Sequence, residues 1–232
     1  MPDAKPKALI VGASRGLGLA MVEEYLSRGW DVVGTVRGNA RTGLHELKEK
    51  QGAALQIETV DIAEQDQIAA LREKLAGQTF DLLFVNSGVA NGPDEAVRNV
   101  STDEFIRVMV TNALGPMRVI ETLDDLVTPT GTIGVMSSGL GSVADNEDGG
   151  WEVYRGSKAA LNTFMRSYAA EHRKGGRSMV IISPGWVRTD MGGPHATLDV
   201  SESIPRVVDV ITAQSGKRGL SYLNYLGKTV RW

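Results

Sequence analysis

Short apolar runs alternate along the chain with longer stretches in which apolar residues recur at helical spacing. The runs predict seven β-strands, at residues 8–11, 31–36, 55–59, 82–85, 132–136, 179–182 and 220–223. The longer stretches predict helices near residues 16–28, 40–51, 64–76, 102–127, 152–173 and 202–214. Strands that alternate with helices indicate an α/β fold with a parallel sheet and helices on both of its faces.

Helix boundaries follow from local capping residues. Ser101, three residues before Glu104, predicts a capping box at the start of the 102–127 helix. We expect Ser201 to cap the last helix, with Pro205 still inside its first turn. No internal repeat or long linker divides the chain, so residues 1–232 are expected to form a single domain.

Composition narrows the functional class. The net charge is -3 with no basic stripe, which argues against a nucleic-acid or anionic-membrane partner. The absence of cysteine excludes disulfides and thiolate chemistry, and three scattered histidines indicate no metal site. No segment reaches the ~18 apolar residues of a membrane span, and the N-terminus does not read as a signal peptide. We therefore expect a cytoplasmic protein.

A glycine-rich loop lies between the first predicted strand and the first predicted helix. Glycine permits the sharp turn and the close approach of backbone to a phosphate, and the helix N-terminus offers unpaired N–H donors. The loop therefore predicts a dinucleotide site, although a plain strand-to-helix turn would give the same spacing. Its residues are Gly12, Ala13, Ser14, Arg15, Gly16, Leu17 and Gly18.

The end of the second strand indicates which dinucleotide is bound. An NAD site usually has an acidic residue there, but this chain reads Thr35-Val36-Arg37 with no carboxylate. Arg37, with Arg15 on the other side, could pair with the 2′-phosphate of NADP(H). The alternative is two solvated surface arginines.

Tyr154 and Lys158 lie four residues apart near the start of a predicted helix and therefore share one face. An ammonium beside a phenol favours the phenolate and is expected to lower the phenol pKa. Tyr154 could then exchange a proton with a carbonyl oxygen or alcohol. The alternative is a surface Tyr–Lys pair.

Five motifs together resemble the short-chain dehydrogenase/reductase family. They are the glycine loop, Asn86-Ser87-Gly88, the Ser137–Gly141 segment, Tyr154-x-x-x-Lys158 and Pro184-Gly185-x-x-x-Thr189. Val11 and Val85 replace a threonine and an asparagine of the family pattern, and we infer that these two neighbouring positions became apolar together. The resemblance implies a Rossmann-type, doubly wound sheet in the order 3-2-1-4-5-6-7.

The resemblance also implies residue roles. Asn112, Ser138, Tyr154 and Lys158 would form a catalytic tetrad, in which Ser138 polarises the carbonyl and Asn112 holds a water. Lys158 would also bind the nicotinamide ribose, and Asp61-Ile62 would contact the adenine. The remaining expected cofactor-binding residues are Asn86, Ser87, Gly88, Pro184, Gly185, Val187 and Thr189.

The C-terminal part narrows the resemblance to the Sniffer-type carbonyl reductase and C-factor-like branch, with a short substrate loop around 190–203. Family dimers use the faces of the helices at 102–127 and 152–173, so a homodimer is possible here. The loop 142–153 carries Asp145, Glu147 and Asp148, which could discourage anionic substrates or simply be solvated. Candidate pocket residues are Trp151, Trp186, Met191 and His195.

The function expected from these features is NADPH-dependent reduction of a small aldehyde, ketone or quinone-like carbonyl, with Tyr154 as the proton donor. The same residues could oxidise a secondary alcohol in the reverse direction. A non-catalytic, NADP(H)-sensing signalling protein of C-factor type is the alternative from another class. Such a protein would not need the tyrosine, and this chain keeps the whole tetrad.

Overall fold

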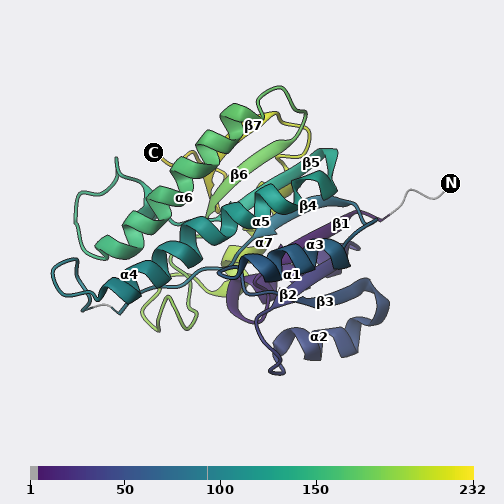
Figure 1. Cartoon of the computed structure of the whole chain (residues 1–232), viewed down its shortest axis with the longest axis horizontal. Coiled ribbons are helices and arrows are strands. Elements are labelled where there is room, and N and C mark those ends of the chain that lie inside the picture. The colour runs from purple at the N-terminus through teal and green to yellow at the C-terminus, as the bar shows by residue number, and fades with distance from the viewer. Residues whose placement is uncertain (1–4, 93) are drawn as a thin grey trace.

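A computed structural model describes residues 5–92 and 94–232 and contains one parallel sheet (Figure 1). The strand order is β3-β2-β1-β4-β5-β6-β7, and every neighbouring pair is parallel. This confirms the predicted sheet and its order. The strands are β1 (Lys7–Val11), β2 (Asp31–Val36), β3 (Leu55–Thr59), β4 (Phe80–Val85), β5 (Val127–Met136), β6 (Ser178–Ser183) and β7 (Gly219–Asn224).

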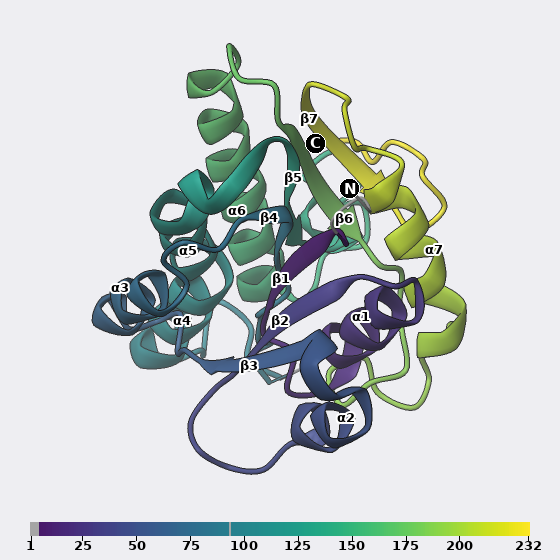
Figure 2. The same cartoon turned by 90° about the vertical axis from the view of Figure 1, so that its right-hand side faces the viewer.

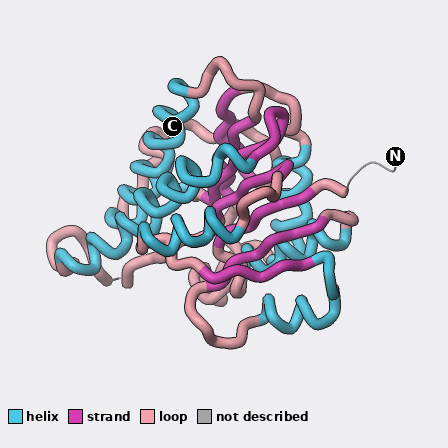
Figure 3. Tube along the Cα trace, turned by 45° about the vertical axis from the view of Figure 1, so that its right-hand side comes forward, coloured by secondary structure: helices cyan, strands magenta, loops and turns pink. Residues whose placement is uncertain are grey.

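Helices cover both faces of the sheet and bury two apolar layers (Figures 2 and 3). One layer includes Met117, Ile120 and Leu161, from the side of α3, α5 and α6. The other includes Met21 and Val207, from the side of α1, α2 and α7. The helices are α1 (Gly16–Ser27), α2 (Gly43–Gln51), α3 (Gln65–Lys74), α4 (Thr102–Met109), α5 (Gly115–Leu123), α6 (Glu152–Glu171) and α7 (Val200–Thr212).

The helix predicted at 102–127 was wrong in its interior and at its end. A π-helical turn at Val110–Leu114 separates α4 from α5. The helical chain ends after a 3₁₀ turn at Asp124–Leu126, because Val127 is buried and pairs with Phe80 in the sheet. β5 therefore begins five residues earlier than predicted.

The predicted caps need two corrections. Asp199, not Ser201, caps α7, because its carboxylate accepts from the backbone N–H of Glu202 while the Glu202 side chain accepts from Asp199 N. Pro205 consequently lies in the second turn, and the loop predicted at 190–203 ends at residue 199. At α4 only half of the predicted box forms, since the Glu104 carboxylate pairs with Arg107 instead of the cap.

Candidate active site at the carboxyl edge of the sheet

The predicted motifs gather at one edge of the sheet. The glycine loop follows β1, Asn86 follows β4, Ser137 follows β5 and Pro184 follows β6. Because all strands are parallel, these positions lie at their common carboxyl edge, where ligands of such sheets bind.

The glycine loop has no room for side chains at two positions. A Cβ on Gly12, whose φ is +89°, would lie 2.3 Å from the Ser87 Oγ. A Cβ on Gly18 would lie 2.0 Å from the carbonyl oxygen of Gly12, which also accepts a 2.9 Å bond from Asn86 Nδ2. The loop is therefore pinned to the segment after β4.

The N-terminus of α1 fits an anionic ligand. Arg15 occupies the cap position without a side-chain hydrogen bond to the helix, and the first turn carries no acidic residue. In the described chain, the first N–H groups of this twelve-residue helix therefore meet no capping side chain. The uncapped backbone N–H groups, together with glycines in place of bulkier residues at Gly12 and Gly18, form a cradle suited to a pyrophosphate.

The two apolar replacements are neighbours, as inferred from the sequence. Val11 and Val85 pair across β1 and β4, and both are buried in the same apolar layer. The carbonyl oxygen of Val11 still accepts from the N–H groups of Asn86 and Ser87, at 2.9 and 3.2 Å. The connection between the glycine loop and the segment after β4 is thus made by backbone and needs no polar side chain at either valine.

The two predicted phosphate-binding arginines have different surroundings. Arg37 is exposed directly after β2. Arg15 forms an ion pair with Asp190, in which both side chains are 76% exposed. Asp190 follows Thr189, so this pair links the glycine loop to the loop after β6.

Asp61 and Ile62 follow β3, as expected. Asp61 Oδ1 accepts a 3.0 Å bond from Ala63 N, so this carboxylate also caps the turn before α3. The Ile62 side chain is buried in the core against Gly115, so the predicted contact with the adenine would come from its backbone.

Tyr154 and Lys158 share one face of α6, with Nζ 5.9 Å from the phenol ring centroid. Lys158 is only 3% exposed, and its Nζ donates a 2.9 Å bond to the carbonyl oxygen of Met136. Burial lowers the pKa of Lys158 to about 8. This buried position excludes the alternative of a surface Tyr–Lys pair.

The pKa of Tyr154 moves in the opposite direction from the sequence-based expectation. Burial of the phenol raises its pKa, and a hydrogen bond with Ser138 opposes part of that increase. The Lys158 ammonium does not offset burial, because it points to the Met136 carbonyl instead of the phenol oxygen. Among the protein's own groups, burial therefore favours the neutral, proton-donating phenol.

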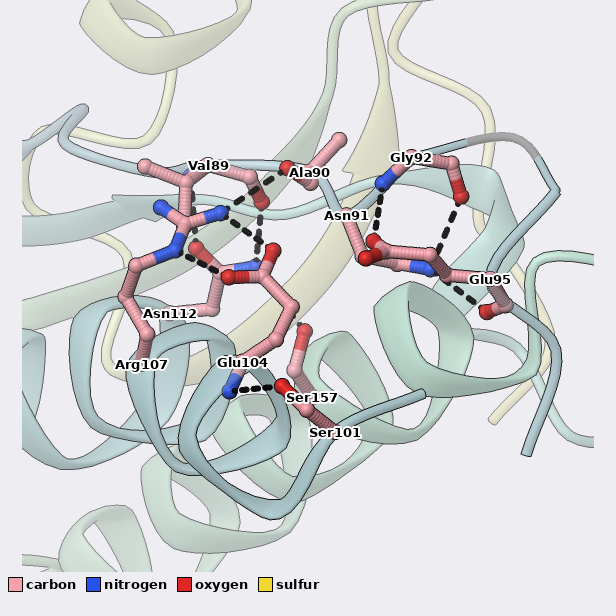
Figure 4. Close-up of polar contacts among 10 residues, drawn as sticks. All are labelled: Val89, Ala90, Asn91, Gly92, Glu95, Ser101, Glu104, Arg107, Asn112 and Ser157. Carbon is pink, nitrogen blue, oxygen red and sulfur yellow. Dashed lines mark hydrogen bonds and ion pairs between the residues drawn. The ribbon is translucent and has the colours of Figure 1, made fainter. Parts of the chain in front are cut away.

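Asn112 lies in the π-helical turn and is fully buried. Its Oδ1 accepts from Val89 N at 2.8 Å, and its Nδ2 donates to Val89 O and to Ser157 Oγ at 2.7 and 2.9 Å (Figure 4). A Cβ on Gly88 would lie 3.2 Å from Lys158 Nζ and 3.4 Å from Asn112 Oδ1, so both atoms border the same small space. π-turns of this kind occur frequently at functional sites.

Two supporting residues were missed from the sequence. Ser157 Oγ donates to Tyr154 O at 2.7 Å and accepts from Asn112, which joins α6 to the π-helical turn. Arg107 donates to Ala90 O at 3.2 Å while paired with Glu104, and it fixes the segment after β4 (Figure 4). For Arg107, the one signal in the sequence was its position three residues after Glu104, the spacing of an ion pair on a helix.

The loop after β6 is closed on itself and faces the glycine loop. Thr189 Oγ1 accepts from Gly192 N at 3.1 Å, and the Trp186 indole donates to Gly192 O at 2.8 Å. Val187 is buried and forms a bridge to Leu198. The Thr189 methyl lies 3.9 Å from a Cβ placed on Gly16.

The predicted pocket residues lie on loops around this edge. Trp151, Trp186 and Met191 are 40%, 53% and 49% exposed, and His195 is also exposed. Trp151 has φ +55°, a conformation that costs a non-glycine residue about 1–3 kcal/mol and often marks a functional segment. Of the loop acids, Asp145 pairs with Arg231, so it serves loop structure.

In the part of the chain that the structure describes, no helix is long and apolar enough to cross a membrane. Within the same residues, no cluster of three or more His, Cys, Asp or Glu side chains is arranged to hold a metal ion.

Comparisons with known proteins agree with this geometry. The family model described as short chain dehydrogenase matches residues 6–197. A Burkholderia multivorans protein described as a short-chain dehydrogenase/reductase, with bound NADP, is 58% identical, with a TM-score of 0.97 and coverage of 99% of this chain and 100% of that one. The carbonyl reductase Sniffer of D. melanogaster is 29% identical, with a TM-score of 0.89 and coverage of 99% and 100%.

The C-signal protein of Myxococcus xanthus is 37% identical over 154 residues, which are 66% of this chain and 92% of that protein. The matched model covers most of the chain, and four of the five motifs follow strands at one edge of the sheet, while the fifth, on α6, reaches the end of β5 through the bond from Lys158 to Met136 O. The chain therefore belongs to the short-chain dehydrogenase/reductase family, with Sniffer-type carbonyl reductases and C-signal among its relatives.

Proposed function

We propose that this protein is an NADPH-dependent reductase of small carbonyl compounds, with Tyr154 as the proton donor. The observation that carries the proposal is the buried Lys158 on the same face of α6 as Tyr154, with its Nζ bordering Gly88 after β4, and with Ser138 as the hydrogen-bond partner of the Tyr154 phenol. The NADP-bound Burkholderia structure and the Sniffer carbonyl reductase support the cofactor and the reaction class.

The chain's own residues suit the cofactor. Gly12, Gly16 and Gly18 with Ser14 and Leu17 would hold the pyrophosphate at the N-terminus of α1. Arg37 and Arg15 would bind the 2′-phosphate. The nicotinamide half would lie along the segments after β4 and β6, which carry Asn86, Ser87, Gly88, Pro184, Gly185, Val187 and Thr189. The bound cofactor supplies the hydride.

In the proposed reaction, Ser138 Oγ donates a hydrogen bond to the substrate carbonyl oxygen and fixes its direction. Tyr154 donates its proton to the same oxygen, and burial keeps the phenol protonated for this step. Lys158, whose pKa is about 8, would hold the ribose and could return a proton near neutral pH. Asn112 holds the segment at Val89 and the helix at Ser157 in place around this lysine.

The first test combines a carbonyl panel with Tyr154→Phe. We expect NADPH oxidation with at least one aldehyde, ketone or quinone-like substrate, reduced by about 10²–10⁴-fold in the variant, since general acid catalysis contributes that much. Tyr168→Phe is the matched control. Tyr168 is also on α6 but lies away from the proposed site, and its phenol donates to Asp124. Tight NADPH binding with no turnover of any carbonyl would overturn the reductase and favour a sensor.

The direction of the reaction is tested with the same enzyme. Oxidation of secondary alcohols with NADP⁺ is measured beside the reduction of the matching ketones at pH 7. A larger kcat/KM for reduction supports the proposed direction. A larger value for oxidation would assign the protein as an alcohol dehydrogenase that uses the same four residues.

A further inference from the structure

We propose that Tyr222 is a positioning residue of the active site, which fixes Ser138 through its main-chain carbonyl group. The inference rests on the proposed function, because it assigns Tyr222 an effect on the reaction that Ser138 promotes. Tyr222 lies on β7, the edge strand, and no family motif considered above includes it.

The contact crosses a strand. The Tyr222 hydroxyl donates a 2.5 Å hydrogen bond to the carbonyl oxygen of Ser138, which follows β5. β6 lies between β5 and β7 in the sheet (Figure 2). The bond therefore joins β7 to the segment after β5, which is not its neighbouring strand. Tyr222 is 2% exposed, and burial raises the pKa of its hydroxyl to about 12, so it remains a donor at neutral pH.

Ser138 is held at several points, and the tyrosine bond is the one that reaches its main chain from another element of the fold. Its Oγ accepts from Leu140 N at 3.1 Å, and its carbonyl oxygen also accepts from Gly141 N at 2.9 Å, both in the following 3₁₀ turn. Those bonds would survive a rotation of the whole turn. Asn162 Nδ2 holds the end of the turn through Gly141 O at 3.2 Å. The bond to Tyr222 ties the carbonyl group of Ser138 itself to the edge strand, and we infer that it thereby sets the direction of Ser138 Oγ towards Tyr154.

The last residues of the described chain hold the tyrosine and the far end of the same loop. The Trp232 ring packs on the Tyr222 ring at a centroid distance of 5.5 Å, and Arg166 covers Trp232 at 4.6 Å. The carbonyl oxygen of Trp232 accepts a 2.9 Å bond from Ala144 N, and Arg231 pairs with Asp145. Residues 138–145 are thus fixed to the C-terminal segment at both ends.

A purely structural role is the competing explanation, since a buried phenol needs an acceptor wherever it lies. The two roles differ in what a hydroxyl deletion changes. Loss of a structural bond lowers stability and leaves catalytic constants alone. Loss of a positioning bond lowers kcat, leaves the KM for NADPH unchanged and alters the titration of Tyr154, because Ser138 helps to set the pKa of that phenol.

The experiment compares Tyr222→Phe with Tyr168→Phe in the full chain. Both remove a phenol hydrogen bond to an oxygen, at 2.5 and 2.7 Å, and both keep the ring. We expect Tyr222→Phe to lower kcat about 5-fold, the size of one ordinary hydrogen bond, with an unchanged KM for NADPH. Reduction requires the protonated phenol, so the alkaline limb of its pH profile should move to higher pH. Tyr168→Phe should alter neither quantity.

The double variant Ser138→Ala with Tyr222→Phe tests the route. If Tyr222 acts through Ser138, the double variant is no slower than Ser138→Ala alone, because the two effects are not independent. If Tyr222→Phe is active and has the kcat and the alkaline limb of the pH profile of the wild type, the inference is overturned and the proposed function still stands. Multiplicative losses in the double variant overturn it as well.

A wild-type protein without turnover would overturn the proposed function, and one readout still tests Tyr222 in that case. Hydrogen–deuterium exchange over residues 137–144 should rise in Tyr222→Phe and remain at the wild-type level in Tyr168→Phe. Equal exchange in both variants would show that the tyrosine does not hold the Ser138 turn.

Discussion

Replacing the buried lysine with methionine should stabilise the protein while it removes activity. Lys158 is 3% exposed and has one carbonyl oxygen as its hydrogen-bond acceptor. Burial lowers its pKa from 10.5 to about 8, a difference of 2.5, and at 1.36 kcal/mol per pKa unit the charged form costs the folded state about 3 kcal/mol. Lys158→Met removes that cost and leaves the Met136 carbonyl without its donor, which offsets about 1 kcal/mol.

The expected net effect is a gain of roughly 2 kcal/mol in the free energy of unfolding at pH 7. The sign follows from proton binding: the folded pKa is depressed, so the unfolded chain binds more protons and the wild type gains stability as pH rises from about 8 towards 10.5. The advantage of the variant should therefore shrink by about 2 kcal/mol between pH 7 and pH 9.5.

Urea unfolding of both proteins at pH 7.0, 8.5 and 9.5, without added cofactor, measures this difference. All other titrating groups are the same in the two proteins, so their contributions cancel in the difference between the two free energies of unfolding. Lys217→Met, at an exposed position, controls for loss of an ammonium and is expected within about 0.5 kcal/mol of wild type. A Lys158→Met protein that is less stable at pH 7, or whose difference from wild type does not change with pH, would refute the reasoning from burial. Its NADPH turnover should fall at least about 100-fold.

Two further predictions concern the cofactor phosphate. Arg37→Asp should raise the KM for NADPH at least about 10-fold more than the KM for NADH, because a charge-assisted contact to the 2′-phosphate becomes a repulsion. Steady-state kinetics with both cofactors measure the two KM values, and an equal effect on both would refute the role of Arg37. Asp190→Asn should lower the Kd for NADPH by up to about 5-fold, since an exposed ion pair is worth at most about 1 kcal/mol and its loss releases Arg15. Fluorescence titration measures the Kd for NADPH. Asp209→Asn is the control, because it breaks another exposed pair, between Arg28 and Asp209. Weaker binding in Asp190→Asn would show that the Arg15–Asp190 pair helps to hold the cofactor.

The sheet could be predicted because its signals are local and repeated. Each strand is a short apolar run, helical segments separate each strand from the next, and connections of this kind favour parallel neighbours. The same topology brings every strand end to one edge, so the motifs could be placed together before any contact was known. The inferred adjacency of Val11 and Val85 follows from this and is confirmed by their register.

The details that escaped prediction depend on contacts between distant residues. The π-turn at Asn112 interrupts a stretch with regular helical spacing, and the bonds to Val89 and Ser157 that accompany it come from residues 23 and 45 positions away. The partner of Arg15 lies 175 residues along the chain. The rise in the Tyr154 pKa depends on burial, which the Tyr-x-x-x-Lys spacing does not specify.

The energetic cost of the site argues that it is kept for chemistry. A protein selected for stability alone would not bury the ammonium of Lys158 against a single carbonyl, nor hold Trp151 in a left-handed conformation three residues before the tyrosine. These costs fall in one helix and its N-terminal cap, and the helix packs on the turn that carries Asn112. A sensor that only bound a dinucleotide would need the glycine loop and the arginines. It would gain nothing from a buried lysine whose pKa lies near neutral pH, and for that reason the energetics favour an enzyme.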